Sequence, residues 1–502
     1  MKVRTVGMLA ALGAMVTSTT VWSLTPPGGL NGEVASQASP MGLEAPTMRF
    51  DDWTFSDGTT LHVEGRLGHP VVAAGRSNET FLLVRTEAPA TTTGTAKTPP
   101  LNLAIVVDRS GSMAGKRMDN AIQAAQGMVD KMKDGDRVSV ITYDTRTQLL
   151  VPPTILRADN RGDVRRTIGT IAPAGDTCIS CGLEAGLREL ATTQVGQGAM
   201  VSRMLLLSDG EATAGVRDLD GFRQLAERAR RGGVSVSAIG VDVDYNEEIM
   251  SVVGRHSNGR HAFVEDVGSL SQMFRDELSS LHKTVAGDTD VRIRLAPGVE
   301  LLEVFDRSSR TENGEVVVPV GSVAEGDERT VLMRLRLPAG GVGSQPVADV
   351  KVDFRDFIKG GRGHCEGKLT ATRDDDAGRW SALDPVVGAR VTRTLTARSL
   401  RRANSLAKKG EVDQARKQLQ QAKDRLKKKR QKVGWRHAPT RRGVVDKDFD
   451  AQMAALKSAD REFAQPAPNA PPAPVTGAGQ ARPSPPRATI RRNMEKADAF
   501  SF

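Results

Sequence analysis

Three oxygen-bearing side chains, those of Asp108, Ser110 and Ser112, alternate at the end of a strongly apolar stretch. Alternate residues of an extended segment point the same way, so this spacing can aim all three side chains at one point. Carboxylate and hydroxyl oxygens are the ligands that hard divalent cations take in proteins. The spacing therefore predicts half of a cation site. Small polar residues around Gly111 are also typical of an ordinary turn, which is the better explanation of such a motif on its own.

Two further oxygen ligands lie downstream, in the positions that complete such a site. Thr177 lies in a glycine-containing loop that leads into a predicted helix, and Asp209 closes an apolar run that begins at Met204. In an open parallel α/β sheet, ligands bind in the crevice beyond the carboxyl ends of the strands. Asp108 and Asp209 must both lie at that edge, so we expect them to meet there with Thr177.

Apolar stretches and amphipathic helices alternate through this part of the chain. Predicted strands occupy residues 101–107, 137–143, 204–207 and 234–241. Between the first two strands, apolar residues recur at helical spacing from Met118 to Met132, the pattern of a helix that faces a core. Strands that alternate with helices predict an α/β fold with a mostly parallel sheet and helices on both faces.

This order of motifs and elements resembles a von Willebrand factor type A domain with a complete metal-ion-dependent adhesion site. The resemblance covers residues 101–272 and rests on the Asp-x-Ser-x-Ser motif, the threonine loop and the later Ser-Asp-Gly. It implies a Rossmann-like fold and a divalent cation held by Asp108, Ser110, Ser112, Thr177 and Asp209. In such sites the two aspartates often act partly through water, so the direct ligands stay open. One departure is Asp176, where relatives usually carry Gly.

The types of the five oxygen donors favour a cation that binds an external ligand. Ser110, Ser112 and Thr177 are neutral, so the cation keeps much of its charge, and an open coordination position would attract an external carboxylate. Six oxygens around a small hard ion suit Mg²⁺ or Mn²⁺, with Ca²⁺ as an alternative if the site expands. The resemblance implies that a Glu or Asp of a partner protein fills the open position. The extra carboxylate of Asp176 would tighten cation binding or compete with that ligand.

The first 23 residues have the pattern of a secretory signal peptide. Lys2 and Arg4 precede an apolar stretch that is too short to span a bilayer, and small residues follow it up to Ser23. Residues 24–48, rich in Gly, Pro and Ser, form a predicted linker. We therefore expect the protein in the periplasm, in the cell envelope or outside the cell. Beyond residue 23, no apolar run approaches the roughly 20 residues that a spanning helix needs.

Short strands on both sides of the α/β segment predict a second unit. Residues 49–100 contain two strand-like stretches and a Thr/Pro-rich connection. Residues 284–373 alternate apolar and polar side chains with turns between the stretches, which is typical of an antiparallel β-sandwich. Because strands precede and follow the α/β segment, we expect residues 50–88 to join 284–373 in one sandwich with the α/β domain inserted.

A basic helical hairpin is predicted over residues 385–436, where Gly410 divides two helical patterns. Residues 390–436 hold 17 Lys or Arg against 3 Asp or Glu, in a chain whose net charge is +10. Such helices could contact an anionic membrane or an acidic protein, although a solvated charged face explains them equally well. Export and the lack of interleaved aromatic residues argue against nucleic acid. Residues 437–502, Pro/Ala-rich in part, are predicted to be a largely disordered tail.

The chain has three cysteines. Cys178 and Cys181 lie at the start of a predicted helix just after Thr177, where such a pair can close a local disulfide in an oxidising compartment. The bond would stiffen the loop that carries a metal ligand. Cys365 is left over beside His364, and one Cys-His pair is poor evidence for zinc.

No common catalytic motif occurs in the sequence: it has no His-Glu-x-x-His, no Gly-Lys-Ser/Thr loop and no Gly-x-Ser-x-Gly. We therefore expect a non-enzymatic adhesion or scaffold protein of the cell envelope or exterior, which binds a partner's carboxylate through a divalent cation. Two alternatives stay open. One is a metal-assisted hydrolase, in which Asp176 is the residue to examine as a base. The other is a structural envelope protein whose cation only stabilises the fold.

Overall fold

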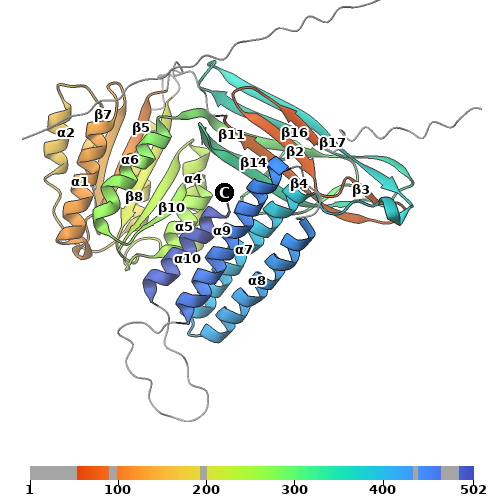
Figure 1. The fold of residues 1–502 in the computed structure, drawn as a ribbon. Helices are drawn as coiled ribbons and strands as arrows, with labels where there is room; N and C mark the ends of the chain where they lie inside the picture. Colours follow the sequence, from red (N-terminus) through yellow and green to blue (C-terminus); the bar gives the residue numbers. More distant parts are fainter. Residues whose placement is uncertain are drawn as a thin grey trace, which may run out of the picture. The chain divides into compact units, whose positions relative to one another are not determined.

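The computed structural model describes residues 54–89, 99–192, 200–242, 244–433, 439–464 and 486–501. These residues form an α/β unit, a β-sandwich and a group of C-terminal helices (Figure 1). The expected signal peptide at 1–23 and linker at 24–48 lie outside the described residues. In the part of the chain that is described, no helix is both long enough and apolar enough to cross a membrane.

A six-stranded sheet forms the centre of the α/β unit, with the strand order β10-β9-β8-β5-β6-β7. Neighbouring strands are parallel except β7, which runs antiparallel to β6. The strands are β5 (Leu101–Asp108), β6 (Arg137–Tyr143), β7 (Thr147–Ile155), β8 (Val201–Ser208), β9 (Ser235–Val241) and β10 (Arg260–Val264). The predicted α/β class with a mostly parallel sheet is confirmed.

Helices cover both faces of this sheet because its central strands are apolar on both sides. In β5, Leu103 and Ile105 belong to one core, whereas Ala104 and Val106 belong to the other. The first core includes α1 (Lys116–Lys131), α2 (Arg161–Ile168) and α6 (Leu270–Leu281), and the second includes α3 (Ile179–Thr192), α4 (Leu219–Arg231) and α5 (Glu247–His256). Short 3-10 turns, η1 (Gly111–Met113) and η2 (Val267–Ser269), precede α1 and α6.

Two sheets form the β-sandwich, with strand orders β1-β2-β4-β15-β12 and β13-β14-β11-β16-β17-β3. The strands that precede the α/β unit are β1 (Thr54–Asp57), β2 (His62–Leu67), β3 (Val71–Ala73) and β4 (Asn78–Glu87). Those that follow it are β11 (Thr284–Leu295), β12 (Glu300–Val304), β13 (Arg310–Glu312), β14 (Glu315–Ala324), β15 (Glu328–Leu337), β16 (Gly343–Asp356) and β17 (Arg362–Asp374). Alternating apolar side chains of both sheets, such as Val84 and Val350, share one core.

Strands from before and after the α/β unit are paired with one another in both sheets. β4 pairs antiparallel with β15 along its whole length, from Asn78 to Glu87, and β3 pairs in parallel with β17. The chain leaves the sandwich after β4, forms the α/β unit and returns through β11. The α/β unit is therefore an insertion in the sandwich.

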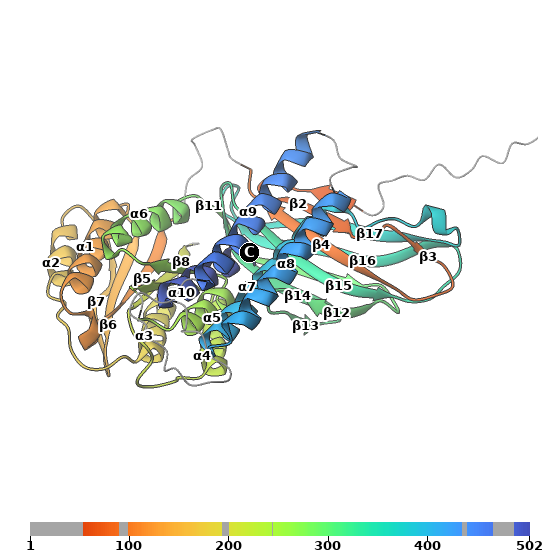
Figure 2. The same ribbon diagram turned by 60° about the horizontal axis from the view of Figure 1, so that its bottom comes forward.

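Within the described residues, four helices and one 3-10 turn follow the sandwich: η3 (Ala377–Arg379), α7 (Pro385–Lys408), α8 (Val412–Val433), α9 (Pro439–Phe463) and α10 (Arg487–Ala499). A turn in which Gly410 has a φ of +80° joins α7 to α8. Helices α7, α8 and α9 lie side by side (Figure 2).

The expectation of a largely disordered tail over residues 437–502 is wrong for α9 and α10. Phe449, Leu456 and Phe463 recur every seven residues of α9 and are buried in one core with α7 and α8. Ile490 of α10 belongs to the same core. These few apolar residues stand among Ala and charged residues, so the composition concealed a helical period. Residues 465–485, which include most of the Pro/Ala-rich stretch, lie outside the described residues.

Candidate metal centre

The two predicted carboxylate ligands lie at the carboxyl edge of the central sheet. Asp108 is the last residue of β5, Asp209 follows the last residue of β8, and these strands are parallel neighbours. Both aspartates are completely buried. Ser208, at the end of β8, donates a hydrogen bond from Oγ to Asp108 Oδ2 at 2.8 Å. Adjacent strands of a packed sheet therefore fix the separation of the two carboxylates.

The loop after β5 links these carboxylates through hydroxyl groups. The Ser110 backbone N–H donates to Asp108 Oδ1 at 2.9 Å, and Ser112 Oγ donates to Asp209 Oδ1 at 2.7 Å. The Oγ atoms of Ser110 and Ser112 lie 3.1 Å apart. Four of the five predicted ligands therefore belong to one hydrogen-bonded group.

Thr177 approaches this group from another loop. A Cβ atom placed on Gly210 would lie 3.3 Å from Thr177 Oγ1 and 3.6 Å from Ser112 Oγ. The two hydroxyls therefore converge over the backbone of Gly210, where an added side chain would crowd the hydroxyl of Thr177. The structure thus brings all five sequence-predicted residues to one place.

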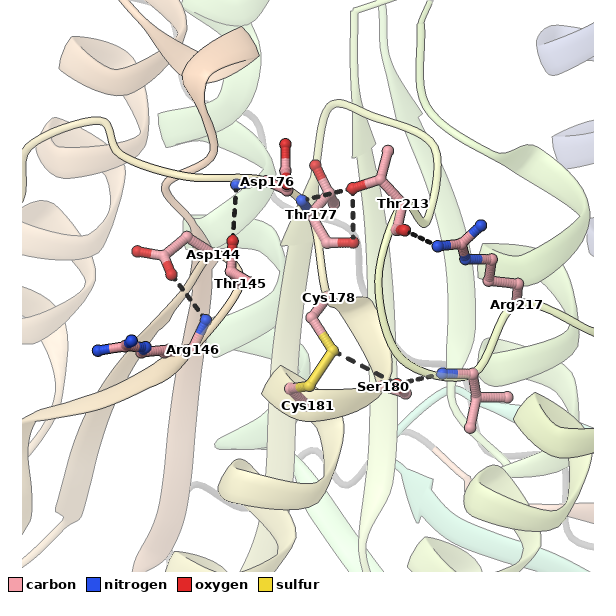
Figure 3. The surroundings of a disulfide bond; sticks show 11 residues. Asp144, Thr145, Arg146, Asp176, Thr177, Cys178, Ser180, Cys181, Thr213 and Arg217 are labelled. Atoms are coloured by element: carbon pink, nitrogen blue, oxygen red, sulfur yellow. Dashed lines mark hydrogen bonds between the residues drawn. A yellow bond between two sulfur atoms is a disulfide. The ribbon is translucent and has the colours of Figure 1, made fainter.

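Hydrogen bonds and a disulfide hold the loop that carries Thr177 (Figure 3). The Thr177 N–H donates to Thr213 Oγ1 at 2.9 Å, and the Thr177 carbonyl accepts from the Thr213 N–H at 2.9 Å. Cys178 and Cys181 are joined by a disulfide at the start of α3. Ser180, inside that turn, accepts a hydrogen bond at Oγ from the Val216 N–H at 3.0 Å. The disulfide turn is therefore tied to the segment that follows Asp209.

The serine loop and the threonine loop also contact each other. The Gly111 N–H donates to the Gly175 carbonyl at 3.1 Å, and the Ala174 N–H donates to the Arg109 carbonyl at 2.6 Å. Asp176 is exposed next to this contact, and its backbone N–H donates to Thr145 Oγ1 at 3.1 Å. Asp176 thus lies at the exposed rim of the loop, in contrast to the buried aspartates.

Burial raises the pKa of both aspartates. It raises the pKa of Asp108 to about 6, although hydrogen bonds from Ser110 and Ser208 act in the opposite direction, and the neighbouring Asp209 raises it further. Burial also raises the pKa of Asp209, against the effects of Ser112 and Arg117. A nearby cation favours the ionised form of each carboxylate. The two carboxylates and three hydroxyls are hard oxygen donors, and this set fits a divalent ion such as Mg²⁺ or Mn²⁺.

Arg117 is a further residue of the centre, which the sequence pattern did not reveal. It lies in the first turn of α1, and its Nη1 donates to Asp209 Oδ2 at 2.9 Å. Its Nε and Nη2 donate to Asp242 Oδ2 at 2.9 and 2.6 Å. The guanidinium therefore occupies one oxygen of Asp209 and adds positive charge beside the ligands.

Comparisons with known proteins concern the α/β unit and the fold. Residues 102–276 match the family described as von Willebrand factor type A domain. An uncharacterized protein of Synechocystis sp., sll0103, is 26% identical over 271 residues, which are 52% of this chain and 63% of that protein. The uncharacterized protein YfbK of Escherichia coli is 23% identical over 300 residues, 57% of this chain and 51% of YfbK. This chain therefore spans less than two thirds of the length of either relative.

The family also occurs in animal proteins that this chain resembles over a shorter stretch. Human inter-alpha-trypsin inhibitor heavy chain H2 is 26% identical over 196 residues, 36% of this chain and 20% of that protein.

Two solved structures share the fold. A von Willebrand factor type A protein from Catenulispora acidiphila has a TM-score of 0.66 at 15% identity and covers 90% of this chain and 98% of its own. The ArnB paralog VWA2 from Sulfolobus acidocaldarius has a TM-score of 0.57 at 15% identity, with 88% and 100% covered. These likenesses show the fold, and the matched residues 102–276 identify the α/β unit described above as a von Willebrand factor type A domain.

Proposed function

We propose that this protein is an adhesion or scaffold protein, which binds an acidic side chain of a partner protein through a divalent cation at its type A domain. Asp108, Ser110, Ser112, Thr177 and Asp209 hold the cation. The observation that carries the proposal is the convergence of two buried carboxylates and three hydroxyls at the carboxyl edge of the central sheet.

The charge balance supports an anionic ligand for the cation. Two carboxylates offset the charge of a divalent ion, but Arg117 already pairs with one oxygen of Asp209. Arg117 is also paired with Asp242, so the attraction for a partner carboxylate comes from the cation itself, because three of its five protein ligands are neutral hydroxyls. Gly111 and Ser112 are exposed, as is Asp176 on the adjoining loop, so a partner can reach the centre from solvent.

Export is the second part of the proposal. It rests on the signal-like residues 1–23 and accords with a disulfide between Cys178 and Cys181, because such bonds persist in oxidising compartments. N-terminal sequencing of the protein from fractionated cells tests it. Cleavage near Ser23 in an envelope or secreted fraction is the expected result, and an intact N-terminus in the cytosol would contradict it.

The basic helices are not part of the proposed partner site. Arg416 and Lys423 of α8 pair with Asp460 of α9, and Arg430 pairs with Asp450. Some of the charge that suggested an anionic membrane or acidic protein is therefore matched within the chain. These ion pairs favour a structural explanation for that part of the charge.

Titration calorimetry with Mg²⁺ and Mn²⁺ tests the cation site on the full chain. We compare Asp108→Asn and Thr177→Val, which keep side-chain size but remove oxygen ligation, with the control Asp134→Asn. Asp134 is a carboxylate of the same domain, 62% exposed and paired with Arg161. Binding by the native chain and the control, with loss of about tenfold or more in both site variants, is the expected result. Equal cation affinity in all four proteins would contradict the proposed site.

The partner is tested separately, by capture from an envelope extract with each protein as bait. A captured protein that is lost on chelation and is also lost with Asp108→Asn supports cation-mediated binding. If the cation binds normally but chelation does not affect capture, the cation only stabilises the fold.

A further inference from the structure

A groove of about 250 Å³ lies between α7 and α8, outside the type A domain. Every residue that lines it belongs to one of these two helices. Lining positions three and four residues apart recur from 392 to 399 in α7 and from 422 to 429 in α8, so each helix turns one face toward the groove. We call it the hairpin groove and define it by Leu395, Thr396, Ala422, Arg425, Leu426 and Lys428.

The inner surface of the hairpin groove is mainly apolar. Leu395 is 39% exposed in the middle of α7, and the buried Leu426 borders the groove from α8. Two hydroxyls also line it, but both are already bonded within the helices. Thr396 Oγ1 donates a hydrogen bond to Gln452 Oε1 at 2.9 Å. Ser399 Oγ donates to the Leu395 carbonyl at 2.8 Å, so an occupant of the groove meets mainly apolar contacts.

Three cations, Arg425, Lys428 and Lys429, line the groove from α8. All three side chains are exposed, and no Asp or Glu is among the lining residues. Arg425 Nε donates to the Gln421 carbonyl of its own helix at 3.3 Å, and none of the three cations forms an ion pair with another described residue. Like charges three and four residues apart destabilise a helix. The helix dipole offsets part of this repulsion near the carboxyl end of α8, but it does not account for the apolar surface beside the charges.

The shape of the groove fits a helix. Positions 392 to 399 of α7 span about 10 Å at roughly 1.5 Å per residue, which corresponds to two turns of a docked helix. Side chains of a third helix pack into the furrow between two neighbouring helices, as they do in helix-in-groove recognition. An amphipathic helix with an apolar face and acidic flanks therefore matches both the apolar surface and the charges.

Two other kinds of occupant fit less well. Small-molecule sites typically enclose roughly 300–1,000 Å³, so the groove is below the size of a typical ligand site. Helices that bind a membrane surface turn Leu, Phe or Trp toward the lipid, whereas Leu419 and Leu426 of α8 are both buried. A recessed apolar strip with a basic rim therefore suits a protein segment better than a bilayer.

We propose that the hairpin groove binds an acidic amphipathic helix of a partner protein. A large apolar side chain of that helix packs against Leu395, and its Asp or Glu side chains pair with Arg425, Lys428 and Lys429. This surface is separate from the metal centre and needs no cation. Its test therefore does not depend on the function proposed above.

Fluorescence anisotropy of a labelled peptide, titrated with the full chain, tests the proposal. The probe is a synthetic peptide of about 18 residues with Leu on one helical face and Glu on the other, because shorter isolated helices are marginal in water. Two control peptides have the same length. In one the leucines are dispersed around the helix, and in the other Lys replaces every Glu. All titrations are done without divalent cations, so the metal centre holds no cation that could bind Glu.

Two substitutions alter the groove at exposed side chains, so the fold tolerates them. Leu395→Ser removes the exposed apolar side chain, and Lys428→Gln removes one charge of the rim. The matched control for the first is Leu149→Ser in β7, where the leucine is 45% exposed. The matched control for the second is Lys427→Gln, the exposed neighbour of Lys428 that does not line the groove.

Saturable binding of the acidic peptide by the native chain and by both control variants is the expected result, without binding of either control peptide. Leu395→Ser should bind the acidic peptide about tenfold more weakly, since the apolar area that it buries is lost. Lys428→Gln should bind it about threefold more weakly, because exposed ion pairs contribute little, and added salt should weaken native binding.

Three outcomes overturn the proposal. The first is the absence of saturable binding of the acidic peptide. The second is equal affinity of the groove variants and their controls, which would place the peptide elsewhere on the chain. The third is binding of phosphatidylglycerol vesicles that both groove variants lose, with no binding of the peptide, which would assign the basic rim to a membrane.

Discussion

Asp498→Asn perturbs the buried charges that hold α10 in place. Asp498 is 2% exposed, and its carboxylate lies 3.1 Å from His261 Nδ1, 3.0 Å from Arg401 Nη2 and 3.4 Å from Arg255 Nε. Burial alone would raise the pKa of Asp498, but these partners lower it below its usual range. The ionised carboxylate therefore stabilises the docked helix.

The expected loss of free energy of unfolding follows from the charges that stay buried after the substitution. Removing one partner of a buried ion pair typically costs about 3–5 kcal/mol, because the remaining charge stays buried. Arg401 and Arg255 keep 19% and 20% of their side chains exposed, so water screens part of their charge. Asn also keeps the size of Asp, so no cavity adds to the cost. We therefore expect the lower end of that range, about 3 kcal/mol.

Urea unfolding monitored by circular dichroism measures the change in the free energy of unfolding. Hydrogen exchange over residues 487–499 shows whether α10 opens before the rest of the chain. The matched control is Asp450→Asn, whose carboxylate is 64% exposed and pairs with Arg430, so its loss should cost about 1 kcal/mol or less. If the two substitutions lower the free energy of unfolding equally, the buried network does not hold α10.

Four further predictions follow from the same structure. The pKa of Asp498 is lowered in the folded state, so its contribution to the free energy of unfolding is complete above the unfolded-state pKa of about 4. The difference in that free energy between the native chain and Asp498→Asn should therefore shrink as the pH falls from about 4 toward 2. Urea unfolding at each pH measures this difference. Gly210→Ala places a methyl group 3.3 Å from a ligand hydroxyl, and calorimetry should find cation affinity reduced about tenfold with a normal thermal midpoint; unchanged affinity would contradict convergence over this glycine. Leu456→Ala should lower the free energy of unfolding by about 2–4 kcal/mol, whereas substitution of the exposed neighbour, Lys457→Ala, should change that free energy little. Equally small effects of the two substitutions would support a disordered tail instead. Asp176→Asn should leave the cation affinity within about threefold of the native value, because Asp176 lies at the exposed rim of the loop. A larger loss would make Asp176 a ligand of the cation.

The fold of the type A domain was predictable because its signals are local. β5 is buried over its whole length and is apolar from Leu103 to Val107, a run that ends at Asp108. The strand-end positions of Asp108 and Asp209 then followed from the rule that parallel strands end at one edge. Ser110, Ser112 and Thr177 were predictable for the same reason, since each lies in a short loop beside that edge.

Other features depend on partners that are distant in sequence. Arg117 stands in the first turn of a helix, and only the assembled sheet brings Asp209 and Asp242 within its reach. In α9, the large buried residues Phe449, Leu456 and Phe463 are seven residues apart, a spacing too sparse to mark a helix without the surfaces of α7 and α8.

The insertion of the α/β unit between β4 and β11 sets an order of folding during synthesis. β4 pairs with β15, whose last residue, Leu337, is made 250 residues after Glu87. At roughly 5–20 residues per second, β4 waits about 10–50 seconds for that partner. The α/β unit, built from neighbouring strands and helices, can close in the meantime. Until then the early strands present unpaired edges, which are prone to aggregation, so a slow step or a chaperone at this stage would decide the yield of folded protein.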